Sequence, residues 1–359
     1  MIINIISDNS GGGAELLVRE LHKIYLKRGI DSHVFYFSGD DTLLYKNETI
    51  FDLKKRDPRN ILKIRKLLKK HSSKTNNLIV HSHLTWPFIY TVLASIRIKN
   101  ISFIFTEHNT YNRRRKLKLN KHIERLFYKK FSKIICISEG VRNSLSEWLG
   151  RSFFEKIIVI KNGSRLFKYK SRSKALLAKP RLISIGSLSS RKNFSTTIQA
   201  INKIIDEIDS YTIIGEGSER QNLETLINDL GIQDKVHLPG WSDDIETSLH
   251  DADIQLIPSL WEGFGLVAVE GMSTGLPIIA SNVAGLREVL DPSNPAIQLI
   301  DEIESPNDWA AAISTLINTL QHRNDASISE ASRHQAEKFS LETMADGYLS
   351  IYNEIKNIK

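Results

Sequence analysis

The stretch from Ile254 to Leu290 constrains the fold of this chain more than any other. It reads as an apolar strand (254–258), a glycine-broken loop (259–265), a helix (266–275), a second apolar strand (277–280) and a glycine turn (285–288). This order predicts parallel strands joined by a crossover helix. In open α/β sheets, ligands bind in the crevice beyond the carboxyl ends of the strands, so the loop at 259–265 is the first candidate for a binding site.

Two carboxylates flank this loop, with Glu262 inside it and Glu270 in the first turns of the following helix. The amino terminus of the helix offers unpaired N–H groups and about half a positive charge, which suits a phosphate. Carboxylates are poor phosphate ligands, and they fit better as acceptors for sugar and ribose hydroxyl groups. Gly263 and Gly265 lack a Cβ, so a ligand can approach the backbone closely.

The segment from Glu262 to Glu270 reads Glu-Gly-Phe-Gly-Leu-Val-Ala-Val-Glu and closely resembles the E-x7-E region of family-4 retaining glycosyltransferases. Gly-Leu-Pro-Ile-Ile-Ala from residue 275 and Gly-Leu-Arg-Glu from residue 285 extend the resemblance. It implies an α/β chain of the GT-B fold, in which two Rossmann-like doubly wound parallel-sheet domains face a cleft and use a nucleotide-sugar donor. It also implies that Glu270 binds the ribose and that Glu262 contacts the transferred sugar. The alternative is a helix with two solvated glutamates.

The length of 359 residues exceeds a single typical core and favours two domains. We expect an amino-terminal domain over 1–168 with a carboxyl-terminal crossover helix at about 341–359, a linker over 169–180 and a second domain over 181–340. No apolar run reaches the roughly 18 residues that span a bilayer, and the amino terminus does not look like a signal peptide. The single cysteine, Cys136, lies in an apolar strand, as a reduced buried thiol would. These features favour the cytosol.

The charge is unevenly distributed along the chain. Residues 1–180 hold 37 Lys and Arg against 14 Asp and Glu, a net charge of +23; residues 181–359 hold 12 against 27, a net of −15, and the two sum to +8. The excess concentrates in 53–74 and 113–133, where the second stretch also carries apolar residues at helical spacing (Leu119, Ile123, Leu126 and Phe127). Such a stretch is typical of a helix on a membrane surface and equally of a solvated helix docked on a core. A basic surface can also serve solubility alone.

The first half begins with a strand, a glycine turn at 11–13 and a helix. The turn does not match the dinucleotide fingerprint, because Leu16 occupies the last glycine position, so a nicotinamide site is not favoured. The resemblance implies instead that Gly12 and Gly13 face the donor diphosphate and approach the acceptor.

Histidines stand at two strand ends, where ligands bind in this architecture. His83 closes the strand at 78–80, and His108 follows the strand at 101–106. A histidine in such a place is more often structural than functional. The resemblance places His108 near the reactive carbon of the donor, and His83 ranks below it. The resemblance also implies that configuration is retained at the donor carbon. Apart from Glu107, next to His108, the sequence offers no evident carboxylate nucleophile on the amino-terminal side, so we expect front-face attack and no covalent glycosyl-enzyme.

The loop that opens the second domain, 186–193, resembles the family's G-R-L-x-x-x-K phosphate-binding turn. Lys192 matches the lysine. Ser187 stands where an arginine is usual, and Arg191 is the candidate to supply the missing charge. A cation pair at a strand-to-helix turn suits a diphosphate leaving group, on which negative charge grows as the glycosidic bond breaks. The alternative is two solvated cations in a surface loop.

These features predict a retaining glycosyltransferase that moves a hexose or N-acetylhexosamine from a UDP- or GDP-linked sugar to a lipid-linked glycan, in the synthesis of a cell-surface polysaccharide such as lipopolysaccharide or capsule. The segment 236–241 is included because the resembled family contacts the nucleotide base there. The residues expected in catalysis are His108, Glu262 and Lys192. The residues expected to bind the donor are Gly12, Gly13, Gly186, Arg191, Lys192, Val236, Glu262, Gly263, Phe264, Gly265, Leu266 and Glu270.

We expect no metal and no cofactor besides the nucleotide-sugar, because no Asp-x-Asp pair lies near a strand end to bridge a cation and a diphosphate. The acidic pairs at 40–41, 243–244 and 251–253 fit turns or helix faces better. The expected partners are the donor, a lipid-linked acceptor and an anionic membrane surface, without nucleic acid, at the inner face of the cell membrane. The alternatives are a GT-B-like nucleotide-sugar epimerase, a catalytically silent sugar-binding protein and an NAD-dependent oxidoreductase.

Overall fold

The structure is a computed structural model that describes residues 1–359 except 10–12, 74–77, 110–111, 113–114, 116–119, 171–178, 323–325 and 358–359. The chain forms two compact units. Unit 1 comprises Met1–Gly163 and Leu341–Lys359, and unit 2 comprises Ser164–Ser340. The amino-terminal unit therefore recruits the last helix of the chain.

Unit 1 is built on a seven-stranded parallel sheet with the strand order β3-β2-β1-β4-β5-β6-β7. Its strands are β1 (Ile2–Ile6), β2 (Ser32–Tyr36), β3 (Glu48–Ile50), β4 (Leu78–His83), β5 (Ile101–Glu107), β6 (Lys133–Cys136) and β7 (Ile157–Val159). The strand order reverses between β1 and β4, which is the switch point of a doubly wound sheet. All five residues of β1 are buried, as expected for a parallel sheet that is covered on both faces.

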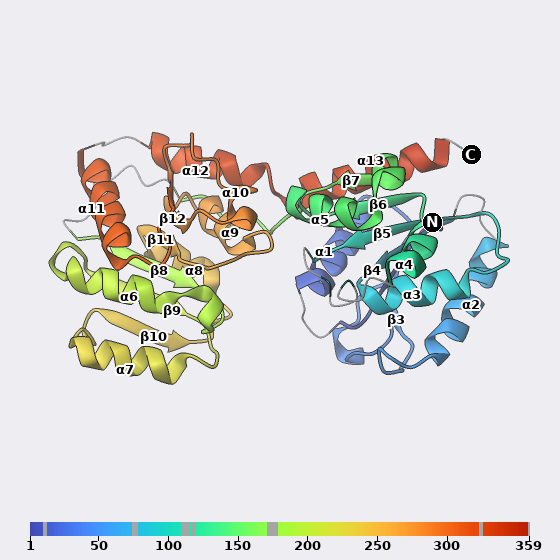
Figure 1. Ribbon diagram of the computed structural model, residues 1–359, viewed down its shortest axis with the longest axis horizontal. Helices are drawn as coiled ribbons and strands as arrows, with labels where there is room; N and C mark the ends of the chain where they lie inside the picture. Colours follow the sequence, from blue (N-terminus) through green and yellow to red (C-terminus); the bar gives the residue numbers. More distant parts are fainter. Residues whose placement is uncertain are drawn as a thin grey trace. The chain divides into compact units, whose positions relative to one another are not determined.

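Helices cover both faces of this sheet, and successive strand residues point to opposite layers (Figure 1). The helices of unit 1 are α1 (Gly13–Lys27), α2 (Arg59–Ser72), α3 (Thr85–Ala94), α4 (Asn120–Tyr128), α5 (Glu139–Leu149) and α13 (Leu341–Asn357). Ile2 packs with Tyr25 of α1 and Tyr348 of α13, whereas Ile3 belongs to the layer that contains Leu68 of α2. The layer of α1 and α13 therefore covers the face that also carries the polar side chains described below.

Unit 2 is built on a six-stranded parallel sheet with the strand order β10-β9-β8-β11-β12-β13. Its strands are β8 (Arg181–Ile185), β9 (Ser210–Ile214), β10 (Val236–Gly240), β11 (Ile254–Ile257), β12 (Ile278–Ser281) and β13 (Ile297–Ile300). Its helices are α6 (Phe194–Lys203), α7 (Arg220–Leu230), α8 (Ile245–Asp251), α9 (Leu266–Ser273), α10 (Ala284–Arg287), α11 (Pro306–His322) and α12 (Ser327–Glu337). The order reverses between β8 and β11, so the two loops that follow these strands leave the sheet side by side.

These two sheets confirm the predicted architecture of two Rossmann-like, doubly wound parallel-sheet domains. The boundary lies earlier than the linker expected at 169–180. The backbone N–H of Phe167 donates to Ser273 Oγ at 2.9 Å, and Lys170 Nζ donates to the carbonyl of His250 at 2.9 Å. The segment 164–170 is thus already fastened to unit 2, and most of the expected linker, 171–178, lies outside the described residues.

Candidate active site

The two loops at the switch point of unit 2 carry the charged residues expected at the donor. The first loop runs from Gly186 to Lys192 after β8, and the second runs from Pro258 to Gly265 after β11. The strands themselves are paired, and the N–H of Leu260 donates to the carbonyl of Arg191 at 2.8 Å. The sequence motifs at 186–193 and 259–265 are therefore neighbours at one edge of the sheet.

One carboxylate and two cations meet where these loops touch. Lys192 Nζ donates to Glu262 Oε1, and Arg191 Nη1 donates to Glu262 Oε2 at 3.2 Å. Ser259 Oγ donates to Glu262 Oε1 at 2.9 Å. The side chains of Glu262 and Lys192 are only 9% and 10% exposed, so solvent screens this pair little. The cluster holds two positive charges and one negative charge at the position where doubly wound sheets bind anionic ligands.

Two glycines leave room for the charged residues of these loops and their surroundings. A Cβ on Gly186 would stand 3.0 Å from Cε of Lys192, and a Cβ on Gly285 would stand 2.0 Å from the carbonyl oxygen of Glu262. The second distance is a clash with backbone, which cannot rotate away. Gly285 therefore seats α10 directly beneath the loop that carries Glu262, and Gly186 leaves room for the Lys192 stem.

Ser187, which stands where an arginine is usual, and Arg191, the candidate to supply its charge, lie in different surroundings. Ser187 is exposed, and its hydroxyl lies 3.3 Å from that of Ser189, so it adds no charge to the cluster. Arg191 lies beside Glu262 and adds a second cation to the cluster. Its guanidinium also lies 4.6 Å from the ring centroid of Trp261, which is 62% exposed. Trp261 was not expected from the sequence, because a single tryptophan in a loop has no periodic pattern.

Helix α9 begins beside the cluster and carries Glu270. Gly265 precedes the helix with φ of 79°, a left-handed conformation that favours glycine. Burial raises the pKa of Glu270, and Arg165 opposes this rise, since its Nε lies 3.4 Å from Glu270 Oε1. Arg165 also stacks 4.5 Å from the ring centroid of Phe167. No pattern in the sequence indicates Arg165, because 105 residues separate it from its partner.

Three expected donor-binding residues are placed by their packing. Gly263 is open, with no atom within 4 Å of the position of a Cβ, so its backbone is accessible to a ligand. Phe264 is only 4% exposed and packs 5.8 Å from Phe339, ring centroid to ring centroid, so its side chain belongs to the core. Leu266 starts α9 and is partly buried against the same core. The side chain of Phe264 is therefore turned away from a ligand, whereas that of Leu266 stays partly exposed.

Val236, expected to bind the donor, lies at the amino end of its strand. It is the first residue of β10, it pairs with Tyr211 at the amino end of β9, and it is 4% exposed within the core. Gly240 stands at the carboxyl end of the strand, beside Trp241, which is 76% exposed. Parallel strands present ligands at their carboxyl ends, so the placement of Val236 does not favour a direct contact with a base, and that contact stays a prediction. Gly240 and Trp241 are the part of the segment 236–241 at that edge.

The expected site residues of unit 1 lie at the carboxyl ends of β1, β4 and β5. Gly13 is the first residue of α1, and Gly12 lies outside the described residues. His108 is partly buried just after β5, and burial lowers its pKa to about 4, so its ring is neutral at pH 7. Nδ1 of His83 lies 3.3 Å from Nε2 of His108. The two histidines are therefore in direct contact.

Glu107 points to a different layer from the histidines. Its Oε2 accepts from Arg115 at 2.8 Å and from the Tyr128 hydroxyl at 3.2 Å, and the side chain is 3% exposed. A carboxylate held by a buried guanidinium and a phenol is stabilised where it is. It is not poised to leave these partners and attack a sugar.

The acidic pairs of the sequence have structural roles. Asp40 accepts from the N–H of Thr42 at 2.8 Å, Asp244 caps α8, and Asp253 accepts from the N–H of Arg181 at 2.8 Å. Across the described residues, no group of three or more His, Cys, Asp or Glu side chains has the geometry to hold a metal ion.

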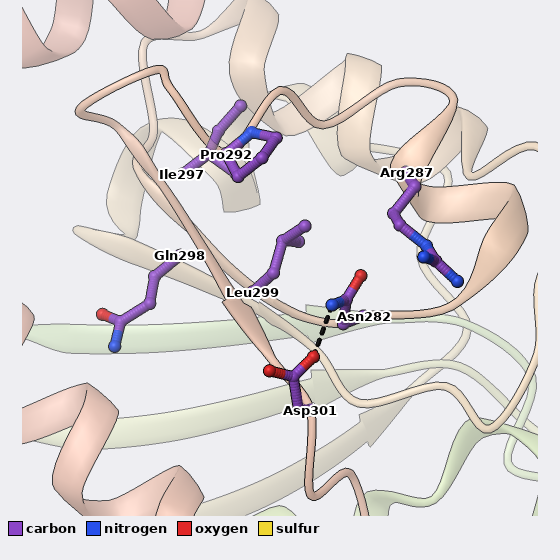
Figure 2. Close-up of a pocket in the computed structure, with 7 residues that line it drawn as sticks. All are labelled: Asn282, Arg287, Pro292, Ile297, Gln298, Leu299 and Asp301. Carbon is purple, nitrogen blue, oxygen red and sulfur yellow. Dashed lines mark hydrogen bonds between the residues drawn. The ribbon is translucent and has the colours of Figure 1, made fainter.

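A cavity of about 490 Å³ lies at the edge of the unit 2 sheet, away from the cluster. Figure 2 shows Asn282 donating to Asp301 at the carboxyl ends of β12 and β13, with Arg287 beside them. The lining residues are Asn282, Arg287, Pro292, Ile297, Gln298, Leu299 and Asp301. It includes none of the residues expected at the donor, and β12 separates it from β11.

Within the described ranges, no helix has both the length and the hydropathy needed to cross a bilayer.

Comparisons with known proteins cover nearly the whole chain. Residues 11–166 match the sequence family described as Glycosyltransferase Family 4, and residues 167–334 match Glycosyl transferases group 1. An uncharacterized glycosyltransferase of Methanocaldococcus jannaschii is 29% identical over 96% of this chain and 95% of its own. The lipopolysaccharide core biosynthesis glycosyltransferase LpsD of Rhizobium meliloti is 29% identical over 63% of this chain and 65% of its own. The crystal structure of Anabaena HepE with UDP matches with a TM-score of 0.81 at 20% identity, over 98% of this chain and 99% of that one.

Proposed function

Because the chain belongs to the family-4 glycosyltransferases and has their GT-B fold, we propose that it transfers a hexose or N-acetylhexosamine from a nucleotide-sugar to a lipid-linked glycan, with retention of configuration. The observation that carries this proposal is the cluster of Lys192, Arg191 and Glu262 at the switch point of unit 2. Relatives that act in lipopolysaccharide core biosynthesis support a cell-surface glycan as the product.

The donor diphosphate is the natural ligand of the two cations. In the free protein, Glu262 neutralises one of the two positive charges, so a net charge of one remains. A diphosphate brings about two negative charges and several acceptor oxygens, and it can replace the carboxylate at both cations. As the glycosidic bond breaks, negative charge grows on the leaving diphosphate, and cations held in place in a site of low exposure stabilise it. Lys192 is the better placed of the two, since its ammonium is nearly buried.

Glu262 has a second task once the diphosphate has taken its cations. Its loop is held by Gly285 and its backbone cannot move far, so the released carboxylate stays beside the leaving group. There it can accept hydrogen bonds from hydroxyl groups of the transferred sugar. Glu270 is proposed to bind the ribose hydroxyl groups, because it lies in α9 beyond the phosphate cluster and its partner Arg165 is exposed and displaceable.

The nucleotide is proposed to be UDP, with GDP as the competitor. The structural neighbour Anabaena HepE is solved with UDP and with UDP-glucose, which supports a uridine nucleotide without deciding the sugar. Trp241 at the carboxyl end of β10 offers an exposed aromatic face on which a base can stack. A screen of UDP-, GDP- and ADP-sugars that reads nucleotide release tests this assignment, and release from none of them contradicts it.

Retention is proposed to proceed by front-face attack. A double displacement needs a free carboxylate on the acceptor side, and the buried pair with Arg115 and Tyr128 engages Glu107. The leaving-group oxygens would then assist deprotonation of the acceptor. The anomeric configuration of the product, determined by NMR, tests retention, and a trapped glycosyl adduct on Glu107 would overturn the front-face route.

No metal is needed in this proposal, because Lys192, Arg191 and the start of α9 offset the diphosphate charge. Turnover in the presence of a chelator tests this point. Full loss that magnesium restores would refute it.

Peripheral membrane attachment is proposed to occur through α4. Its buried residues are Glu124, which accepts from Trp148 Nε1 at 2.8 Å, and Tyr128. The apolar residues Ile123 and Leu126 are instead 52% and 66% exposed. Phe127 and Tyr128 pack on the core, so docking does not explain the exposed pair Ile123 and Leu126, and Leu119 lies outside the described residues. An anionic bilayer explains such an exposed apolar pair among lysines and arginines, since each cation near it adds about 1 kcal/mol of attraction.

The charge of the two units supports the same assignment. Unit 1 carries 33 Lys and Arg against 17 Asp and Glu, a net of +16, and unit 2 carries 16 against 24, a net of −8; these sum to +8. Sedimentation with vesicles of phosphatidylglycerol and phosphatidylcholine at low and high salt tests attachment. A double substitution of Ile123→Ser and Leu126→Ser should reduce co-sedimentation, while Leu43→Ser, an exposed apolar control on unit 1, should not. Equal binding of both variants would contradict the role of α4.

A further inference from the structure

A line of hydrogen bonds runs through unit 1 from β1 to His108. Nε2 of His83 lies 3.3 Å from Oδ1 of Asn4, and Nδ1 of His83 lies 3.3 Å from Nε2 of His108. Asn4 and His83 are 3% and 1% exposed. Both lie under the layer of α1 and α13, so solvent cannot replace the contact between them.

The histidines in this line are neutral. Burial lowers the pKa of His83 well below 6.5 and that of His108 to about 4. His81 stacks on His83 with 4.1 Å between ring centroids, and burial lowers its pKa in the same way. The two nitrogens of His81 are engaged by the hydroxyl groups of Tyr352 and Thr106, each at 2.7 Å.

A neutral imidazole has one donor nitrogen and one acceptor nitrogen. If one ring nitrogen donates, the other must accept, so the direction of one hydrogen bond fixes the direction of the next along the line. The Asn4 oxygen that faces His83 can only accept, so His83 donates from Nε2 and keeps a lone pair on Nδ1. That lone pair can only accept, so His108 donates from Nε2. Nδ1 of His108 is then left with a lone pair, and no hydrogen bond to it occurs within the described part of the chain.

We propose that Asn4 and His83 are positioning residues that fix His108 in the tautomer protonated on Nε2, with Nδ1 kept as a hydrogen-bond acceptor for a hydroxyl group. That the hydroxyl belongs to the transferred sugar or the acceptor rests on the function proposed above. Without the line, His108 would exchange between a donor and an acceptor at the same position. With the line in place, Nδ1 of His108 always offers a lone pair to a hydroxyl group.

The orientation of the Asn4 amide is the origin of this preference. The opposite orientation would place Nδ2 against His83, which would reverse every bond in the line and leave the proton of His108 on Nδ1. In the structure, Asn4 Nδ2 is buried without a hydrogen-bond partner among the described residues. The side chain thus leaves two N–H groups unused in order to present its oxygen to His83.

The tautomer can be measured directly in the full-length protein. Long-range ¹H–¹⁵N correlation spectra of a histidine-labelled sample distinguish protonated from bare ring nitrogens, and loss of signals in His108→Gln assigns the residue. We expect His108 to carry its proton on Nε2 at pH 7 in the wild-type protein. A proton on Nδ1, or an even mixture of the two tautomers, would overturn the proposal without the need for any further variant to fold.

Two substitutions of His83 then separate positioning from packing. Asn at this position keeps an amide oxygen close to the place of Nδ1, whereas Leu keeps only the volume. We expect His83→Asn to preserve the tautomer of His108 and most of the transfer rate. His83→Leu should mix the tautomers and lower kcat about tenfold, the loss of one hydrogen bond, with the KM for the nucleotide-sugar unchanged.

A purely structural role for His83 predicts the opposite: a lower unfolding temperature for both variants and an unchanged tautomer in His83→Leu. The proposed transferase function can be refuted independently of the positioning line. If no nucleotide-sugar is turned over but His108 is protonated on Nε2 and responds to His83→Leu, the positioning line stands and the substrate assignment is wrong.

Discussion

The substitution Glu262→Gln tests whether the carboxylate holds the diphosphate site in the absence of donor. It removes the negative charge that Lys192 and Arg191 share, but it keeps the size of the side chain and one acceptor oxygen. Two cations then stand together without an anion between them. The variant should therefore be less stable than the wild-type protein and should bind a diphosphate more readily.

The size of the effect follows from the burial of the pair. Breaking a buried ion pair by removing one partner costs about 3–5 kcal/mol. The amide still accepts a hydrogen bond from Lys192, so we expect a smaller loss, of about 2 kcal/mol. For a unit of this size, that corresponds to a decrease of about 4–8 °C in Tm. Transfer should fall at least tenfold, because the amide is a weaker acceptor for sugar hydroxyl groups.

Inorganic pyrophosphate is the probe that isolates the effect, because it carries neither ribose nor sugar. In the wild-type protein it must displace Glu262 from both cations, whereas in Glu262→Gln it has no charged competitor. Saturating pyrophosphate should therefore raise the unfolding temperature of the variant more than that of the wild-type protein. Glu224→Gln is the matched control, because Glu224 pairs with Arg220 on an exposed helix face of the same unit and should change little.

The reasoning is refuted by two results. If Glu262→Gln unfolds at the wild-type temperature without ligand, the cluster is not held together by its charges. If pyrophosphate stabilises the variant less than the wild-type protein, Glu262 assists phosphate binding and does not compete with it.

Lys192→Ala should lower transfer about 10²–10³-fold through loss of a cation at the leaving group, measured as kcat with saturating donor. Glu270→Ala should weaken UDP binding by about 1–3 kcal/mol and leave pyrophosphate binding unchanged in calorimetry, because only UDP carries a ribose. The pKa of His108 falls from 6.5 in the unfolded chain to about 4 in the fold, so the unfolded chain binds the proton more readily between these values. The contribution of His108 to the stability of unit 1 should be fully present above pH 6.5 and should decline by up to about 3 kcal/mol toward pH 4. The lowered pKa values of His81 and His83 act in the same direction. Denaturation curves recorded across this pH range measure the decline.

The order of strands and helices could be read from the sequence because apolar runs and glycine turns are local signals. The helix at 266–275 and the strand at 101–106 appear as α9 and β5 within one or two residues at each end. The meeting of Lys192 with Glu262 was also foreseeable, since each motif ends a strand and the switch point brings strand ends together. In the basic stretch 53–74, the helix begins only at Arg59, after Pro58, because proline favours a helix start.

The side-chain contacts that could not be predicted share one physical cause. The direction in which a side chain points depends on partners that are distant in the sequence. Phe264 lies in a ligand-facing loop but turns into the core against Phe339. The helical spacing in α4 left a membrane-facing and a core-docked helix equally open; in the structure Tyr128 is buried in the core, and Glu124 accepts from Trp148, which lies 24 residues away. A hydrogen bond between such distant residues produces no repeating pattern in the sequence.

The cluster in unit 2 also implies an order of events. Unit 2 carries a net charge of −8, but in physiological salt this charge acts over only about 8 Å, so it is the local pair of Lys192 and Arg191 that selects an anion. The two carboxylate oxygens of Glu262 cannot pair with these cations and, at the same time, accept strong hydrogen bonds from the hydroxyl groups of a sugar. The carboxylate therefore becomes available to the sugar only when a diphosphate has occupied the cations. A nucleotide-sugar delivers both groups in one molecule, whereas a free sugar meets a carboxylate that is still engaged. The site thus favours the activated donor over a free sugar through competition for one side chain, and the pyrophosphate titration of Glu262→Gln measures the strength of that competition.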